Sequence, residues 1–184
     1  MPAFLLIALA LLTRVMPHHG WMNFTAVGGA LLFFGARRPL RQLWIPVLAL
    51  IATDYYLTTA VYGYGFHLNG YLLTWAWYVG VALMGKALLG QKTTATRVGT
   101  AGLLGPTSFF LISNFAVWTS AFGAPATSLY PATFAGLMSC YGAAIPFYQN
   151  DLASTLLVVM VAFGAPVLVH FVQESFAVKA RVRN

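Results

Sequence analysis

The sequence predicts an all-α integral membrane protein, a polytopic bundle of six transmembrane helices formed by a single domain over residues 1–184. Of these residues, 60% are hydrophobic and 7% are charged, whereas roughly a quarter of the residues in an ordinary soluble domain are charged. So few charges cannot cover the surface of a water-soluble protein of 19.9 kDa. One cysteine and the high apolar content also exclude disulfide-rich and disordered classes. The lipid bilayer is therefore the expected environment.

A transmembrane helix needs about 17 to 25 mostly apolar residues, and six segments account for the predicted helices. In chain order they are residues 2–16, 23–36, 43–62, 71–89, 98–120 and 152–176. Pro17 closes the first segment, and the glycine-rich stretch 63–70 separates the third from the fourth. The first two segments are short, so tilting, local bilayer thinning or loops that dip into the protein must supply the missing length. Small residues in the second and fifth segments indicate close helix packing.

The basic residues predict the orientation of this bundle. If six helices alternate, nine of the ten Lys and Arg residues lie on one side: Arg37, Arg38, Arg41, Lys86, Lys92, Arg97, Lys179, Arg181 and Arg183. The loops on the other side, 63–70 and 121–130, contain none. By the positive-inside rule we expect both termini in the cytoplasm. The net charge of +7 is then an orientation signal, and we expect no nucleic-acid partner.

The apolar segment 131–147 is a candidate for a seventh span. A seventh crossing would place the basic C-terminus outside, against the positive-inside rule. We therefore expect 131–147 to be a re-entrant or interfacial segment on the outer side, packed against protein, because irregular backbone is tolerated at membrane depth only in that setting.

Tyrosine and tryptophan gather in the outer half of the predicted bundle. All nine Tyr residues and four of the five Trp residues fall there, the exception being Trp44. This one-sidedness indicates an outward-facing cavity lined by rings with polar tips, suited to a flat or heterocyclic ligand. An outer aromatic belt enlarged by the short helices is the alternative.

Asp54 lies about three turns into the third predicted helix, where a carboxylate costs roughly 2.5 kcal/mol or more on insertion scales. Arg14, at the outer end of the first helix, is its natural partner. The pair serves either a ligand site or a structural role, as an ion pair that pins two helices. Coupling to protons or sodium through Asp54 is a further alternative.

Other polar and aromatic side chains of the outer half complete the set of candidate ligand contacts. The set is Arg14, His18, Asn23, Asp54, Tyr55, His67, Trp75, Asn114, Trp118 and Tyr141. His67 and Cys140 are candidate ligands for a metal that the bound molecule itself carries. We expect no resident cofactor. No Ser/His/Asp order, HExxH motif or pair of intramembrane acids indicates an enzyme, and no phosphate-binding loop indicates ATP hydrolysis.

The stretch 13–35, TRVMPHHGWMNFTAVGGALLFFG, resembles a family of uncharacterised six-span bacterial membrane proteins, in which an Arg, a Pro-His pair and an Asn-Phe run join the first two helices. Residues 48–54, 113–118 and 135–147 are similar to later parts of that family. In size, six spans and outer cavity, the family in turn looks like the substrate-binding S-components of energy-coupling-factor transporters.

This resemblance implies a multi-pass uptake protein of a bacterial inner (plasma) membrane. It would capture a vitamin-like molecule, cobalamin or another micronutrient, from the outer side, alone or with a separate ATP-driven coupling module as partner. Many S-components dock to that module through an Ala-x-x-x-Ala face on the first helix, but Ala3, Ala8 and Ala10 lack this spacing. In a solitary cobalamin carrier, His67 or Cys140 would be the axial ligand to cobalt.

Two other function classes are compatible with the same residues. The first is a non-transporting membrane subunit or assembly factor that packs against partner proteins through its glycine faces. The second is an ion- or proton-coupled small carrier that uses Asp54.

Overall fold

In the computed structural model, every regular element of the described residues is a helix, which confirms the all-α prediction. The structure describes residues 1–16, 20–123 and 128–182, with side chains up to Pro166. Four segments are long and apolar enough to cross a membrane: Leu40–Val61, Leu68–Leu89, Ala95–Gly123 and Phe134–Pro166. Two further apolar helices are shorter. The chain is thus a helical membrane bundle.

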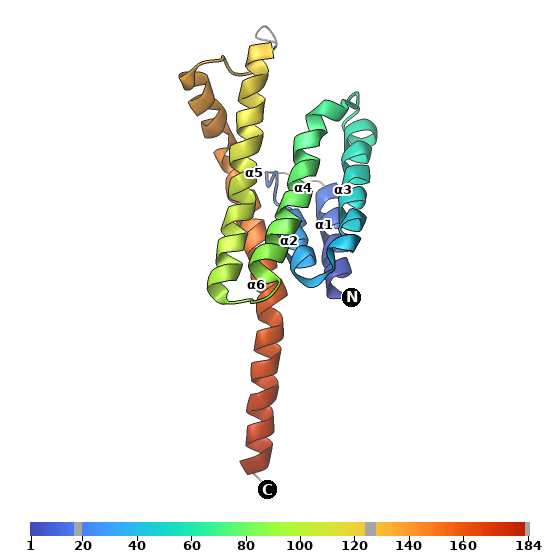
Figure 1. The fold of residues 1–184 in the computed structure, drawn as a ribbon, viewed down its shortest axis with the longest axis vertical. Coiled ribbons are helices and arrows are strands. Elements are labelled where there is room, and N and C mark those ends of the chain that lie inside the picture. The colour runs from blue at the N-terminus through green and yellow to red at the C-terminus, as the bar shows by residue number, and fades with distance from the viewer. Residues whose placement is uncertain (17–19, 124–127, 183–184) are drawn as a thin grey trace.

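The helices alternate in direction along the bundle (Figure 1). They are α1 (Pro2–Val15), α2 (Val27–Arg37), the short η1 (Leu40–Gln42), α3 (Trp44–Tyr56) with its π-helical continuation η2 (Leu57–Val61), α4 (Leu68–Leu89), α5 (Ala95–Gly123) and α6 (Phe134–Val182). The N-terminus and the α2–α3 and α4–α5 connections lie at one end, beyond which α6 extends. We call it the basic end, because Arg37, Arg38, Arg41, Lys86, Lys92 and Arg97 lie in or beside these connections.

Helix α2 is the centre of the bundle. Its residues from Val27 to Ala36 are all buried, and it packs against α1, α4, α5 and α6. A helix of 11 residues is about 16 Å long, too short to cross a hydrocarbon layer of about 30 Å. The helix begins at Val27 and not at residue 23 as predicted, because Asn23 has a left-handed backbone with φ 65°. The α1–α2 connection consequently lies part-way along the bundle (Figure 1).

Glycines let α4 approach α2 closely, as the small residues of the second helix predict. A Cβ atom on Gly35 would overlap the backbone carbonyl of Ala82, and one on Gly85 would overlap the carbonyl of Leu32. Backbone atoms of both helices occupy the space that side chains would need. This contact is available only to glycine, so α2 and α4 are held together by main-chain packing.

The prediction that 131–147 is a re-entrant or interfacial segment separate from the last helix is wrong. Residues 134–147 form the first turns of α6, which continues without a break through position 152, the predicted start of the last helix. Pro146 lies inside this helix, where proline removes a backbone hydrogen bond and bends the axis. The polar residues 149–151 suggested a helix start, but they lie inside α6, where the Asn150 side chain donates to the Met22 carbonyl at 2.9 Å.

We predict that Gly85→Ala lowers the stability of the purified protein by about 2 kcal/mol, because the new methyl group overpacks the contact with α2. Thermal unfolding in detergent, followed by tryptophan fluorescence, measures the change. Gly80→Ala is the matched control on the same helix, since a Cβ at Gly80 meets nothing within 4 Å. Equal melting temperatures for the two variants would contradict the described packing of α2 on α4.

Candidate functional site

The ion pair predicted between Arg14 and Asp54 is confirmed. Arg14 lies in the last turn of α1 and Asp54 in α3. The guanidinium donates through Nε at 3.0 Å and Nη2 at 2.5 Å to Oδ1 of Asp54, whose side chain is fully buried. Trp75 Nε1 donates to the other carboxylate oxygen at 3.0 Å, and the Tyr78 hydroxyl donates to it at 3.1 Å. One carboxylate therefore joins α1, α3 and α4.

Aromatic rings continue this network toward the α3–α4 connection. Phe66 stacks on Tyr71 with ring centres 5.1 Å apart and on Trp75 at 6.2 Å. The Tyr71 hydroxyl shares a hydrogen bond with Thr58. The ring of Tyr55 packs edge-to-face with the ring of Phe66, and their centres lie 5.2 Å apart. The stack fixes the ring of Trp75 and with it the indole that binds Asp54.

Three adjoining cavities meet at Asn23, which lines all of them. The α3 cavity, about 430 Å³, lies beside the Arg14–Asp54 pair. The α5–α6 cavity, about 280 Å³, lies between the two helices that name it. The central cavity, about 160 Å³, contains residues of both: Arg14 from the first and Asp151 from the second. Together we call these cavities the vestibule.

The segment that carries Asn23 is tethered to two helices. The Thr13 hydroxyl of α1 accepts a hydrogen bond from the Ala26 amide at 3.1 Å, which satisfies one free N–H at the start of α2. From α6, Asn150 holds the Met22 carbonyl. Asn23 itself adopts the left-handed conformation that Asn tolerates better than most residues. Its side chain is thus placed at the junction of the cavities by fixed neighbours.

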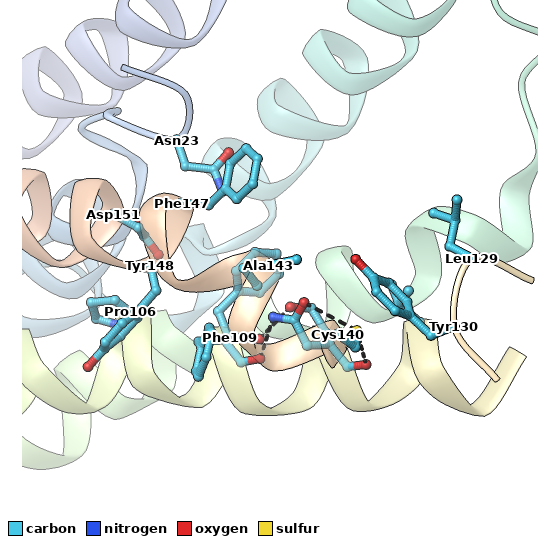
Figure 2. A pocket seen from close by; sticks show the side chains of 15 residues that line it. Asn23, Pro106, Phe109, Leu129, Tyr130, Cys140, Ala143, Phe147, Tyr148 and Asp151 are labelled. Atoms are coloured by element: carbon cyan, nitrogen blue, oxygen red, sulfur yellow. Dashed lines mark hydrogen bonds between the residues drawn. The ribbon is translucent and has the colours of Figure 1, made fainter. Parts of the chain in front are cut away.

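The α5–α6 cavity is elongated, as Figure 2 shows. Asp151, Tyr148 and Pro106 lie at one end, and Leu129 and Tyr130 at the other. Cys140 lies between them, and Asn23 and Phe147 lie toward the same end as Asp151. The lining combines aromatic rings with amide, hydroxyl and carboxylate groups, a composition suited to a ring-bearing organic molecule.

Hydrogen bonds hold the polar side chains of this cavity. The Asn114 amide donates to the Phe110 carbonyl at 2.8 Å. The Cys140 thiol lies 3.4 Å from the Asn114 carbonyl, to which it donates. The Tyr148 hydroxyl pairs with Thr107 at 2.9 Å. Each group keeps unused hydrogen-bonding capacity that a ligand can meet.

Asp151 differs from these groups, because its side chain is only weakly held. Its carboxylate accepts one long hydrogen bond, 3.5 Å from the Thr155 hydroxyl. Among the described side chains, the pair of Arg14 with Asp54 is the only ion pair. No described Lys, Arg or His side chain lies within 4.0 Å of the Asp151 carboxylate. Asp151 lines both the α5–α6 cavity and the central cavity. It is a half-buried carboxylate that faces the vestibule without a positive partner among the described side chains.

The predicted contact residues divide into three groups. Arg14, Asn23, Asp54 and Asn114 line the vestibule. Trp75 lines none of its cavities but binds Asp54, and Tyr55, His67, Trp118 and Tyr141 also line none. His18 lies outside the described residues.

Trp118 and Tyr141 instead join α5 to α6 and to the segment before it, away from the basic end. The Trp118 indole donates to the carbonyls of Pro131 and Thr133 at 3.1 Å. The Tyr141 hydroxyl donates to the Leu111 carbonyl at 2.8 Å. Of the two candidate metal ligands, Cys140 lines the α5–α6 cavity and exposed His67 does not. Among the described residues, no group of three His, Cys, Asp or Glu side chains forms a metal site.

Sequence reasoning missed Phe147, Tyr148 and Asp151 as vestibule residues. Their spacing of three and four places them on one face of a helix. The signal was hidden because the predicted boundary between two segments fell among them. Tyr78 of α4 was also missed, although its spacing of three from Trp75 places both on one helix face, from which the Tyr78 hydroxyl also donates to Asp54.

The chain belongs to a family of unknown function, DUF6580, which matches residues 1–178. This confirms the part of the resemblance that pointed to an uncharacterised family. None of the curated proteins and none of the solved structures matches the chain. Function is therefore argued from the vestibule.

We predict that Asp54→Asn destabilises the protein by about 3 kcal/mol, because it leaves the Arg14 guanidinium without its counter-charge at a largely buried site. Asp151→Asn is the control: it makes the same chemical change at a carboxylate that has no cation within 4.0 Å among the described side chains. Its melting temperature in detergent should not fall below that of the wild type, because no ion pair is broken and a costly charge is removed. Equal losses in both variants would show that the ion pair does not stabilise the bundle.

Proposed function

We propose that this member of the DUF6580 family is a membrane substrate-binding protein of S-component type, which captures a vitamin-like small molecule from the outer side of a bacterial inner membrane. The observation that carries the proposal is the meeting of three cavities at Asn23, in the half of the bundle away from the basic end. Ligand sites of membrane bundles form where facing helices leave a polar hollow.

The size and lining of the vestibule support a small organic ligand. Ligand pockets measure about 300–1,000 Å³, and the two larger cavities, about 430 and 280 Å³, adjoin at Asn23 and Phe147. Phe109 and Tyr148 provide ring faces, and Asn114 and Asp151 provide polar contacts. Among micronutrients, these volumes favour a molecule with one flat ring system over the much larger corrinoid of cobalamin.

The direction of capture follows from charge. The positive-inside rule assigns the basic end to the cytoplasm, so both termini are cytoplasmic in this proposal. The vestibule reaches residues of the opposite end: Tyr62, just after η2, lines the α3 cavity, and Tyr130, before α6, lines the α5–α6 cavity. A ligand would therefore enter from outside.

The alanines of α1 favour a protein that works without a coupling module docked on that helix. Ala3 and Ala10 are buried in the bundle, and only Ala8 faces outward. A face made for docking would present its small residues on the exterior. The glycine face of α2 that suggested a partner subunit is filled within the chain, where Gly29 meets Val158 of α6 and Gly35 meets Ala82 of α4, whereas Gly99 on α5 meets nothing within 4 Å.

An ion-coupled carrier based on Asp54 has weaker support. The carboxylate receives hydrogen bonds from Arg14, Trp75 and Tyr78. A proton or a sodium ion would have to compete with the guanidinium at 2.5 Å. The network suits a fixed structural charge, so we assign Asp54 to positioning the vestibule wall.

A ligand panel tests the proposed function. Protein purified in mild detergent is screened by thermal shift against vitamins, their precursors and metal ions. Binding with nanomolar Kd corresponds to about 12 kcal/mol and raises the melting temperature at micromolar ligand. At least one organic member should produce such a shift. A response to metal ions alone would reject the proposal.

We predict that Asn23→Gly weakens binding of that ligand at least tenfold, since it removes the side chain at which the cavities meet. Glycine adopts positive φ readily, so the backbone of the connection is retained. The matched control is Asn69→Gly on α4, where the exposed amide lines none of the three cavities. Calorimetric titration measures both affinities. An unchanged Kd for Asn23→Gly would remove the vestibule as the binding site.

Reporter fusions test the orientation. A fluorescent protein fused to the C-terminus should fluoresce in whole bacterial cells, and alkaline phosphatase at the same position should be inactive, because its disulfides form only outside the cytoplasm. Alkaline phosphatase inserted after Gly65, in the α3–α4 connection, should be active. The reverse pattern would place the vestibule on the cytoplasmic side.

A further inference from the structure

We infer that the molecule bound in the vestibule is an organic cation, with its positive group at Asp151 and its ring among the aromatic side chains of α5 and α6. This inference rests on the proposed function, since it assigns a charge class to the ligand of that same site. It follows from the charge of the cavities, the neighbours of Asp151 and the size of the space around it.

The charge of the described vestibule is negative. Arg14, Asp54 and Asp151 are its charged lining residues, and Arg14 is matched by Asp54 through two hydrogen bonds. Asp151 is left over, with a single long contact from Thr155. A lone carboxylate at membrane depth is expensive unless a cation or hydrogen-bond donors meet it. A positive ligand supplies the missing counter-charge.

Arg14 does not supply the counter-charge of Asp151. Although Arg14 and Asp151 both line the central cavity, the guanidinium is directed to Asp54, and it forms no ion pair with Asp151. The carboxylate of Asp54 is fully buried and receives the Trp75 and Tyr78 donors as well. The two acids therefore have different tasks: Asp54 holds helices together, and Asp151 faces open space.

The side chains around Asp151 favour an organic cation over a metal ion. Phe147 and Tyr148 precede it by four and three residues on α6, which places their rings on the same helix face. Phe109 of α5 lines both cavities that Asp151 lines. Aromatic faces attract alkylated ammonium groups, whereas a hard metal ion such as calcium needs six or more oxygen ligands. In the described part of the chain, no cluster of three metal-ligating side chains exists.

A charge series on the wild-type protein tests the inference without any variant. The probes are phenyltrimethylammonium, its neutral carbon analogue tert-butylbenzene, and benzenesulfonate. The three share one ring and similar bulk but carry charges of about +1, 0 and −1. Phenyltrimethylammonium should bind at least tenfold more tightly than the other two in calorimetric titration. Equal or tighter binding of the neutral or the anionic probe would overturn the inference and leave the proposed function standing.

Single-residue variants then test whether Asp151 is the residue that binds the positive group of the probe. Asp151→Asn should weaken phenyltrimethylammonium binding at least tenfold, and Asp151→Glu should restore part of it. Glu174→Gln removes one negative charge roughly 35 Å farther along α6 and should leave the affinity unchanged. If Asp151→Asn keeps the wild-type affinity, or if Glu174→Gln loses as much, Asp151 is not the anchor.

The naturally bound molecule gives an independent outcome. Mass spectrometry of material released from the purified protein should find a compound with a fixed positive charge or a basic amine. A neutral or acidic compound would overturn the inference but support capture of a small molecule. Release of no compound, together with no binding of any probe, would overturn both.

Discussion

The ion pair of Arg14 with Asp54 is the interaction on which the rest of the structure depends. A carboxylate buried at membrane depth must be neutralised, and here the last turn of α1 supplies the charge while α4 supplies two neutral donors. Removing one partner of such a pair costs more than the pair itself contributes. The three helices are therefore held in one arrangement, and the position of α1 relative to α3 and α4 determines one wall of the vestibule.

The second constraint is the shortness of α1 and α2. Main-chain packing at Gly35 and Gly85 places α2 in the centre of the bundle, where it has no need to reach both membrane surfaces. The α1–α2 connection consequently lies part-way along the long helices (Figure 1). Tethers from Thr13 and Asn150 fix this connection, so that Asn23 lies where the three cavities meet. The fold and the site are thus linked, because the connection from α1 to the short α2 carries Asn23, which lines all three cavities.

Much of the fold and part of the candidate site could be predicted from the sequence, and the features that could not be predicted have a physical explanation. Length and apolarity predicted the long helices, the scarcity of charge predicted the pairing of Arg14 with Asp54, and glycine content predicted the packing of α2. The path of 131–147 and the role of Asp151 were not predicted. In a membrane, lipid-facing and core-facing side chains are both apolar, so hydrophobic periodicity does not tell which face of α6 lines a cavity. Pro146 and the polar residues after it resemble a helix boundary, although a transmembrane helix tolerates proline where neighbouring groups satisfy the freed backbone.

The central claim is that the vestibule holds a small organic molecule. Native mass spectrometry of the protein, released from its own membrane without added ligand, tests it most directly. The account predicts a bound, non-lipid mass of about a few hundred daltons that fits cavities of about 430 and 280 Å³, and that is lost when Asn23 is replaced by glycine. Protein that carries only phospholipid, in the wild type and the variant alike, would contradict it.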